Sequence, residues 1–242
     1  MTEKRISLWS GPRNVSTALM YSFAQRPDTT VLDEPLYGHY LSITDVQHPG
    51  RDEVLQSMEL DGSKVIVSLC HDDYSKPVLF VKNMAHHLVK LDLSFLDDLH
   101  NVLLIRDPKE MLPSMVKQLP NPVLRDTGLK QQWKLYNRLL ELGNNPVIID
   151  SKELLLNPET ILVKVCHILD IPFFQEMMTW TAGPIKEDGI WSKYWYESVH
   201  DSTGFQPYKP KKDPVPDHLT ELWQECDHFY QLLYREALKV RS

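Results

Sequence analysis

Residues 5–17 read RISLWSGPRNVST, and this stretch decides the fold. Its first part, Arg5–Ser10, is a short apolar run that predicts a β-strand. A helix is expected from about Ser16 to Gln25, ending before Pro27. A strand that passes through a tight turn directly into a helix is typical of an open α/β sheet. The start of such a helix is a natural anion site, because its N–H groups lack intrahelical partners.

Further apolar runs predict the rest of the sheet. They are Thr30–Leu32, Val78–Lys82, Asn101–Ile105 and Val147–Ile149. These runs are continuous rather than alternating, which is the pattern of strands buried on both faces, as in a parallel sheet between helices.

Helical patterns lie between and after these strands. One apolar stripe ends near Gly143 and consists of Leu129, Trp133, Tyr136 and Leu140. Asn157 and Pro158 begin another helix, which directs Leu162, Val165 and Leu169 inward. The last helix starts at about Asp217 and has a stripe of Leu219, Trp223, Cys226, Tyr230 and Leu233. We therefore expect an α/β fold: a three-layer, doubly wound sheet of about five mainly parallel strands with helices on both faces, like that of P-loop NTPases.

Composition narrows the class of protein. The 242 residues contain 26 Lys+Arg against 33 Asp+Glu, a net charge of -7 that argues against a nucleic-acid partner. No apolar run has the length of a signal peptide or a membrane span, so no membrane partner and a cytoplasmic location are expected. Cys70, Cys166 and Cys226 lie far apart, which predicts reduced thiols, no zinc site and no metal. Residues 1–242 are expected to form one domain, with an irregular aromatic-rich segment at about 180–216 before the C-terminal helix.

The turn after the first strand has the residues of a phosphate loop. Gly11 and Pro12 shape it, Arg13 adds a positive charge, and Asn14, Ser16 and Thr17 add polar groups beside the first helical turn. The alternative to a phosphate site is an ordinary strand-to-helix turn with a capped helix start. The loop is not a Walker A motif, because it lacks that motif's second glycine and its lysine.

A second candidate anion site follows the fourth strand. Arg106 ends the strand, Pro108 and Lys109 begin a helix, and Ser114 lies within that helix. Taken alone, this pattern favours the ordinary alternative, an arginine paired with a nearby carboxylate and an exposed serine.

Together, the two motifs resemble those of sulfotransferases. G-P-R-x-x-S-T resembles their 5′-phosphosulfate loop, and R-x-P-K followed by serine resembles their 3′-phosphate motif. A third match covers 147–172, where Asn157-Pro158-Glu159 and Ile168–Pro172 resemble a later family stretch. The resemblance implies the donor 3′-phosphoadenosine 5′-phosphosulfate, the product 3′-phosphoadenosine 5′-phosphate, and a small-molecule acceptor with a hydroxyl or amine.

Site residues follow from the resemblance by position. It implies that Arg13, Ser16 and Thr17 hold the 5′-phosphosulfate and that Arg106 and Ser114 hold the 3′-phosphate. Cytosolic members usually have lysine where Arg13 stands, whereas tyrosylprotein-type members have arginine there. The family's late glycine-rich motif has no clean match. Its nearest substitute is the run Ser202, Thr203, Gly204 and Phe205, followed by Lys209, Lys211 and Lys212.

The acceptor must lose a proton, and two kinds of base compete. Glu34 follows the second strand at the distance from Arg13 that the catalytic glutamate of tyrosylprotein-type members has. His86 and His87 follow Lys82, whose family counterpart lies beside the transferred group. Glu34 is the first choice and the histidines the second. Asp33 is a further alternative to Glu34, because adjacent strand residues face opposite sides.

The sequence does not decide which residues form the acceptor pocket, and it leaves rival functions to be tested. The residues that line either an aromatic cleft or the core are Tyr37, His39, Trp191, Tyr194, Trp195, Tyr196 and His200. One rival is a small-molecule or nucleotide kinase, which the missing Walker lysine disfavours. Another is a nucleotide-binding protein that has lost catalysis. A carbohydrate sulfotransferase is disfavoured by the acidic balance and by the missing anchor.

Overall fold

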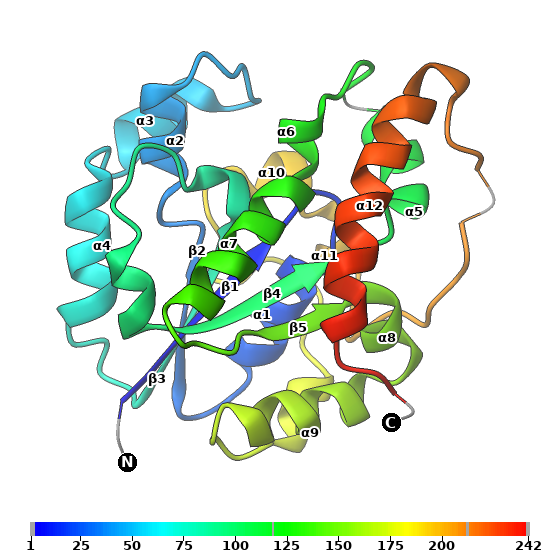
Figure 1. The fold of residues 1–242 in the computed structure, drawn as a ribbon. Coiled ribbons are helices and arrows are strands. Elements are labelled where there is room, and N and C mark those ends of the chain that lie inside the picture. Colours follow the sequence, from blue (N-terminus) through cyan, green and yellow to red (C-terminus); the bar gives the residue numbers. More distant parts are fainter. Residues whose placement is uncertain (1–2, 118, 212, 241–242) are drawn as a thin grey trace.

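The computed structural model describes residues 3–117, 119–211 and 213–240 (Figure 1). Its sheet consists of β1 (Lys4–Ser10), β2 (Thr29–Asp33), β3 (Val78–Met84), β4 (His100–Ile105) and β5 (Val147–Asp150). The strand order is β2-β3-β1-β4-β5 and every pairing is parallel. The predicted parallel α/β sheet is confirmed, and each predicted strand is found within one or two residues of its expected ends.

The central strand β1 places the candidate phosphate loop. Ser10, its last residue, pairs with Met84 of β3 on one side and Leu104 of β4 on the other. After β1 the chain builds β2 and β3 on one side of it and then crosses from β3 to β4 on the other side. The crevice at the carboxyl end of β1 is therefore the topological switch point where open α/β sheets bind ligands.

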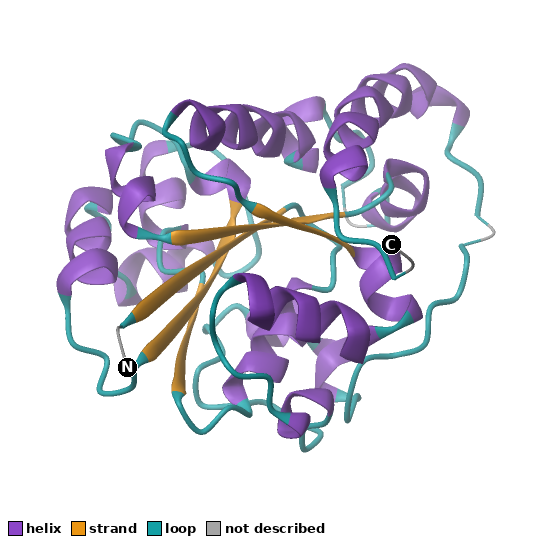
Figure 2. Ribbon diagram, turned by 60° about the horizontal axis from the view of Figure 1, so that its bottom comes forward, coloured by secondary structure: helices purple, strands orange, loops and turns teal. Residues whose placement is uncertain are grey.

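Helices cover both faces of the sheet, as Figure 2 shows. Ile6 and Leu8 of β1 face one core, which includes residues of α1 (Ser16–Ala24), α2 (Tyr37–Ile43), α3 (Arg51–Ser57), α8 (Ser151–Leu156) and α9 (Pro158–Ile168). Trp9 faces the other core, with α4 (Gly62–His71), α5 (Pro108–Met115), α7 (Leu129–Glu141) and α12 (Thr220–Glu236). Consecutive residues of β1, β3, β4 and β5 are buried on both faces, which explains their continuous apolar runs, whereas the edge strand β2 alternates buried and partly buried residues.

Short elements connect these layers. They are η1 (Ala85–His87), η2 (Ser94–Asp98), α6 (Leu124–Thr127), η3 (Gln175–Met178), α10 (Ser192–Trp195), α11 (Glu197–His200) and η4 (Asp217–Leu219). Among the described residues of the irregular segment predicted at 180–216, α10 and α11 are the regular elements. Lys212, which the sequence placed after the substitute for the late motif, lies outside the described residues.

The apolar stripe predicted for α7 coincides only in part with its buried face, because Leu129 is the one stripe residue that is fully buried. Trp133 and Tyr136 are only partly buried and Leu140 is exposed. The buried face instead consists of Leu129, Gln132, Leu135 and Leu139. The Gln132 side-chain amide donates to the backbone oxygens of Trp9 (3.0 Å) and Leu104 (2.8 Å), so a polar side chain occupies a core position that an apolar stripe does not reveal.

The other helical predictions agree with the structure. Asn157 caps α9 by accepting a hydrogen bond from the Thr160 backbone, and Leu162 and Val165 are buried beneath it. On α12, Cys226, Tyr230 and Leu233 are buried. All three cysteines are free and buried. Among the described residues, no helix is both long and apolar enough to cross a bilayer.

Candidate functional site

The carboxyl ends of parallel strands meet at one edge of the sheet, and most of the predicted site residues lie there. The loop after β1 contains 11–15, β4 continues into Arg106, and β2 continues into Glu34. Lys82 is near the end of β3, paired with Asp33.

Gly11 is required by a close approach rather than by an unusual turn. A Cβ atom at this position would lie 2.6 Å from the backbone oxygen of Thr127. The α6–α7 turn therefore packs directly on the loop, and its Gly128 lies against Gly11 as well. The left-handed residue of the loop is Arg13, with φ of 55°.

The Asn14 side chain anchors the loop to the sheet. Its Nδ2 donates to the Leu104 oxygen at 3.0 Å, and its Oδ1 accepts from the Val15 backbone at 2.8 Å. The Ser151 hydroxyl also donates to Asn14 Oδ1 and to the Ile105 oxygen. These contacts hold the loop against β4 and the start of α8.

The start of α1 has the features of an anion site. Ser16 and Thr17 occupy its first turn, which contains no acidic residue, and no side chain of the described residues caps it. The first N–H groups of a helix have no intrahelical partner, and the helix dipole favours a negative charge beside them. Ser16 is buried and Thr17 is partly buried.

The two predicted anion sites are in direct contact. Arg13 Nε donates to Ser114 Oγ of α5 at 3.1 Å, and Arg106 donates to the backbone oxygen of Arg13. Residues about a hundred positions apart in the chain thus meet as one cationic cluster at the switch point.

Arg106 also pairs with a carboxylate of α5, as the ordinary alternative for its motif predicted, although the sequence did not single out Glu110. Glu110 Oε2 lies 3.8 Å from Arg106 Nη2, one helical turn along α5. The Tyr208 hydroxyl donates to Glu110, so the irregular segment reaches this side of the edge. Burial lowers the pKa of Arg106, while Glu110 raises it and Arg13 lowers it further. The i,i+4 spacing of Arg106 and Glu110 is the only sequence signal for this pair.

A buried polar cluster lies at the ends of β2 and β3. Lys82 Nζ donates to Asp33 Oδ1 at 2.8 Å, to Glu34 Oε1 at 2.5 Å and to the Tyr196 hydroxyl at 2.5 Å. An ammonium group has three donors, so these contacts use all of them. Lys82 is 2% exposed, and its charge is met by two carboxylates.

Asp33 and Glu34 both contact Lys82, so the expectation that they face opposite sides was wrong. β2 ends at Asp33, and Glu34 has a left-handed backbone with φ of 44°. This conformation breaks the strand alternation and turns Glu34 back toward Lys82, whose backbone oxygen accepts from the Glu34 N–H at 2.7 Å. A left-handed glutamate is uncommon and costs free energy, and such strain often occurs at functional sites.

The cluster changes the proton affinities of its members. Burial raises the pKa of Glu34, Lys82 lowers it and Asp33 raises it, with a net rise. Burial lowers the pKa of Lys82, but Asp33 and Glu34 raise it well above its ordinary value. Lys82 is therefore charged, and Glu34 is a stronger base than an exposed glutamate.

His87 lies beside Glu34, and the His86 ring centroid lies 4.7 Å from that of His87, with both side chains buried. His87 Nε2 is 4.0 Å from Glu34 Oε2. Burial lowers the pKa of His86 to about 3 and that of His87 well below its ordinary range. The Nδ1 atoms of both have no hydrogen-bond partner among the described residues. Both imidazoles are therefore neutral.

Most of the aromatic residues named as cleft or core pack against one another here. The Tyr37 and Tyr40 rings stack on His87, with centroids 5.1 and 4.8 Å away. Trp191 meets Tyr37 edge-on. His39 instead accepts the Gly62 N–H at Nδ1 (3.2 Å) and donates Nε2–H to the Val89 oxygen (3.0 Å), and Tyr194 is exposed.

The run 202–204 contacts a different part of the molecule. The Ser202 hydroxyl donates to the Val199 oxygen and accepts from Trp180 Nε1. The Thr203 oxygen accepts from the Trp180 backbone, and Gly204 forms a bridge with Thr179. These bonds join the run to residues 179–180 rather than to Arg106 or Ser114.

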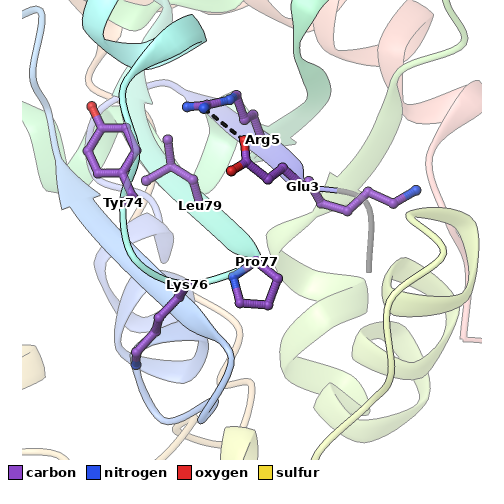
Figure 3. Close-up of a pocket in the computed structure, with 7 residues that line it drawn as sticks. Glu3, Arg5, Tyr74, Lys76, Pro77 and Leu79 are labelled. Carbon is purple, nitrogen blue, oxygen red and sulfur yellow. Dashed lines mark hydrogen bonds and ion pairs between the residues drawn. The ribbon is translucent and has the colours of Figure 1, made fainter.

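A shallow pocket lies at the opposite edge of the sheet (Figure 3). It is lined by Glu3, Lys4, Arg5, Tyr74, Lys76, Pro77 and Leu79, at the amino ends of β1 and β3. Arg5 pairs with Glu3 at 3.0 Å, and none of the predicted site residues lines this pocket. Within the described residues, no cluster of His, Cys, Asp and Glu side chains is suited to a metal ion.

Comparison with known proteins agrees with this geometry. A sequence model of the sulfotransferase domain matches residues 4–237, from the first residue of β1 to just beyond α12. The chain belongs to the sulfotransferase-domain family. The match includes both anion sites and the buried cluster, so every predicted site residue lies inside the sulfotransferase domain.

Solved structures share the fold of this sulfotransferase domain. A sulfotransferase from Alicyclobacillus acidocaldarius is 11% identical with a TM-score of 0.54, covering 98% of both chains. A sulfotransferase domain from the curacin biosynthetic pathway is 14% identical with a TM-score of 0.51, covering 98% of this chain and 99% of that one. At these identities the likeness shows the fold alone.

Two curated relatives from Arabidopsis thaliana are more similar in sequence. Branched-chain-amino-acid aminotransferase-like protein 1 is 44% identical over 210 residues, which are 86% of this chain and 37% of that protein. Protein 2 of the same name is 40% identical over 229 residues, 94% of this chain and 41% of that protein. This sulfotransferase domain thus spans less than half the length of either relative.

Proposed function

We propose that this chain transfers the sulfuryl group of 3′-phosphoadenosine 5′-phosphosulfate to a hydroxyl or amine of a small-molecule acceptor. Family and fold support sulfuryl transfer as the general reaction. The names of the Arabidopsis relatives describe proteins of which this chain matches less than half, so we assign no aminotransferase activity to it.

The observation that carries the proposal is the joined cationic cluster. Arg13, Ser114 and Arg106 contact one another beside the start of α1. In the proposal, the helix start and Arg13 hold the 5′-phosphosulfate, while Arg106 and Ser114 hold the 3′-phosphate. A donor with phosphates at both ends of its ribose matches two adjoining anion sites, whereas ATP has its phosphates at one end only. The loop also lacks the lysine that a P-loop kinase places on its phosphates.

The proposed chemistry needs one base and several positive groups. The acceptor oxygen or nitrogen attacks sulfur, and the bond between sulfur and the 5′-phosphate oxygen breaks. The bonding electrons leave with the 3′-phosphoadenosine 5′-phosphate, and the acceptor proton passes to Glu34. Arg13 and Lys82 stabilise the charge that builds on the leaving and peripheral oxygens, in the way positive groups act in phosphoryl transfer.

Glu34 is the proposed base in preference to His86 or His87. Its carboxylate has a raised pKa and is bound to charged Lys82. The histidines are neutral, but their lowered pKa makes them poor proton acceptors. A base is most effective when its pKa lies near the working pH, which favours the carboxylate.

The experiment that tests the donor is calorimetric titration with 3′-phosphoadenosine 5′-phosphate, with ATP–magnesium as the comparison ligand. We expect micromolar or tighter binding of the bisphosphate and weak or absent binding of ATP. Preference for ATP–magnesium would overturn the proposal in favour of a kinase. A screen with ³⁵S-labelled donor against phenols, alcohols and amines then tests transfer.

Arg106→Ala tests the 3′-phosphate assignment in the same titration. Losing a charge-assisted, partly buried contact costs on the order of 2–3 kcal/mol, so bisphosphate affinity should fall about 30- to 150-fold. Arg138→Ala is the matched control, because Arg138 is exposed on α7 and pairs only with Glu141 among the described residues. Unchanged affinity in Arg106→Ala would contradict the assignment.

A further inference from the structure

Tyr196 joins the irregular segment to the buried cluster. Its ring is 5% exposed, and its hydroxyl donates to the Asp33 carboxylate at 2.8 and 2.9 Å. The same oxygen accepts from Lys82 Nζ at 2.5 Å and from Trp191 Nε1 at 3.1 Å. A phenol has one donor and two acceptor sites, so all of its hydrogen-bonding capacity is used.

The hydroxyl stays protonated at neutral pH. Burial and the Asp33 charge raise the pKa of Tyr196 well above its ordinary value, although Lys82 lowers it. Tyr196 therefore acts as a neutral donor to Asp33 and a neutral acceptor for Lys82. It offsets part of the charge of each without adding a charge of its own.

The segment around Tyr196 is attached at several points. The Gly189 N–H donates to Asp33 Oδ2 at 3.0 Å. Asp188 accepts from the Tyr21 hydroxyl of α1 at 2.7 Å and lies 2.9 Å from His200 Nε2. Asp33 is thus the residue at which β2, Lys82 and the segment 188–200 meet.

Three contacts fix the direction of the Lys82 ammonium. Two come from neighbouring carboxylates, Asp33 and Glu34, and the third comes from Tyr196, whose ring centroid is 4.8 Å from Lys82 Nζ. Without the hydroxyl, Asp33 would lose a donor and Lys82 an acceptor. The carboxylate charge would then be less compensated next to Glu34.

We propose that Tyr196 is a positioning residue for sulfuryl transfer, whose hydroxyl holds Asp33 and Lys82 in the arrangement that keeps the Glu34 carboxylate ready to accept a proton. The catalytic meaning rests on the proposed function, but the arrangement itself can be tested without turnover. The titratable groups that face Glu34 are Asp33, Lys82, Tyr37, His87 and Tyr196.

Tyr196→Phe is the variant that removes only the hydroxyl. It keeps the ring beside Lys82 and Trp191, while Asp33 loses one hydrogen-bond donor. Because Asp33 raises the pKa of Glu34, a less compensated Asp33 should raise the Glu34 titration midpoint further. The carboxyl carbon of Glu34 is followed by NMR in protein labelled with ¹³C at the glutamate side chains, and Glu34→Gln identifies its signal.

The matched control lies two residues away in the same segment. The Tyr194 hydroxyl donates to exposed Glu53 at 3.2 Å, so Tyr194→Phe removes a hydroxyl without touching the cluster. We expect the Glu34 midpoint to rise by about half a pH unit or more in Tyr196→Phe, equivalent to about 0.7 kcal/mol. It should match wild type in Tyr194→Phe. An unchanged midpoint in folded Tyr196→Phe would overturn the proposal.

Two further readouts separate positioning from packing. Trp191→Phe removes a hydrogen-bond donor to the Tyr196 oxygen and should raise the Glu34 titration midpoint by a smaller amount than Tyr196→Phe does. If Tyr196→Phe does not fold, the midpoint in Trp191→Phe decides whether Tyr196 positions Glu34. Exchange of the Gly189 amide hydrogen should be about tenfold faster in Tyr196→Phe, because its acceptor Asp33 is less fixed. Wild-type exchange at Gly189 would contradict the proposed link.

Turnover gives the last comparison. With any acceptor from the screen, Tyr196→Phe should lower kcat about tenfold or more and leave the Kd for 3′-phosphoadenosine 5′-phosphate unchanged, since Arg13 and Arg106 are untouched. Wild-type kcat would overturn the proposed role of Tyr196. If wild type itself transfers no sulfuryl group, the proposed function fails, and the titration of Glu34 still decides whether Tyr196 positions it.

Discussion

At the residue scale, Glu34 combines features that rarely occur together in a glutamate. It is 9% exposed, has a left-handed backbone and contacts a buried lysine. Burial raises the pKa of its carboxyl group, Lys82 lowers it and Asp33 raises it, and the net rise makes the carboxylate a stronger base. Strain and burial of this kind are hard to explain by stability alone, because both cost free energy.

Glu34→Gln tests this residue as the base. We expect kcat to fall on the order of 100- to 10,000-fold, the usual loss when a general base is removed. Binding of 3′-phosphoadenosine 5′-phosphate should be preserved, because glutamine still accepts a hydrogen bond from Lys82. Calorimetry and steady-state kinetics measure the two quantities. Full activity would assign the base to His86 or His87 instead.

The Glu110 carboxylate lies beside Arg106, the arginine that is proposed to bind the 3′-phosphate. A phosphate at Arg106 would have to compete with this carboxylate. Glu110→Gln should therefore tighten binding of the bisphosphate about three- to tenfold, as expected for removal of about 1 kcal/mol of like-charge repulsion. Glu141→Gln, at an exposed position of α7, is the control. Weaker binding in Glu110→Gln would mean that Glu110 itself contacts the donor.

At the scale of elements, the loop after β1 depends on the α6–α7 turn. Gly11 leaves no room for a Cβ beneath the Thr127 oxygen, and Gln132 of α7 bonds the Trp9 oxygen just before the loop. The candidate phosphate loop is thus supported from one side by α7 and from the other, through Asn14, by β4 and α8.

Gly11→Ala tests this support. The added methyl group must push the α6–α7 turn away, which should destabilise the protein by about 1–3 kcal/mol in urea unfolding. It should also weaken bisphosphate binding, because the loop shifts. Gly143→Ala is the comparison: its Cβ meets nothing within 4 Å, although its φ of +80° strains alanine. Gly143→Ala should lose stability only, and equal binding in both variants would contradict the role of Gly11.

At the scale of the whole molecule, a ligand at the switch point contacts elements from both halves of the sheet. Arg13 follows β1, Arg106 follows β4, and Ser114 belongs to α5. A bound bisphosphate therefore stabilises the native state as a unit, by RT ln(1 + [L]/Kd).

Thermal unfolding measures this linkage. At a bisphosphate concentration of 100 times Kd, stability should rise by about 2.7 kcal/mol, which corresponds to a rise in Tm of roughly 5–10 °C for a domain of this size. In Arg106→Ala, whose affinity should be about 30- to 150-fold weaker, the rise at the same concentration should shrink to about 0.3–0.9 kcal/mol. Neither rise should depend on magnesium. A magnesium-dependent shift with ATP would support the kinase alternative.

The amino-acid sequence alone determined the layers of the fold and the first anion site. Continuous apolar runs such as Val78–Lys82 are a local property of strands buried on both faces, and the residues of 11–17 lie together in any fold that places a strand before a helix. The resemblance to sulfotransferases rested on the same short-range patterns, and the family match over 4–237 confirms it.

Only the tertiary structure decided how these parts combine. Gln132 of α7 occupies a core position because backbone oxygens of strands β1 and β4 accept its amide hydrogens. Helical periodicity does not reveal such partners. Asp33 and Glu34 face the same lysine because one backbone angle reverses the strand alternation. Tyr196 reaches Asp33 across 163 residues of chain. Local patterns encode burial and turns, whereas the partners of a buried charge depend on which distant segments the fold brings to the same edge of the sheet.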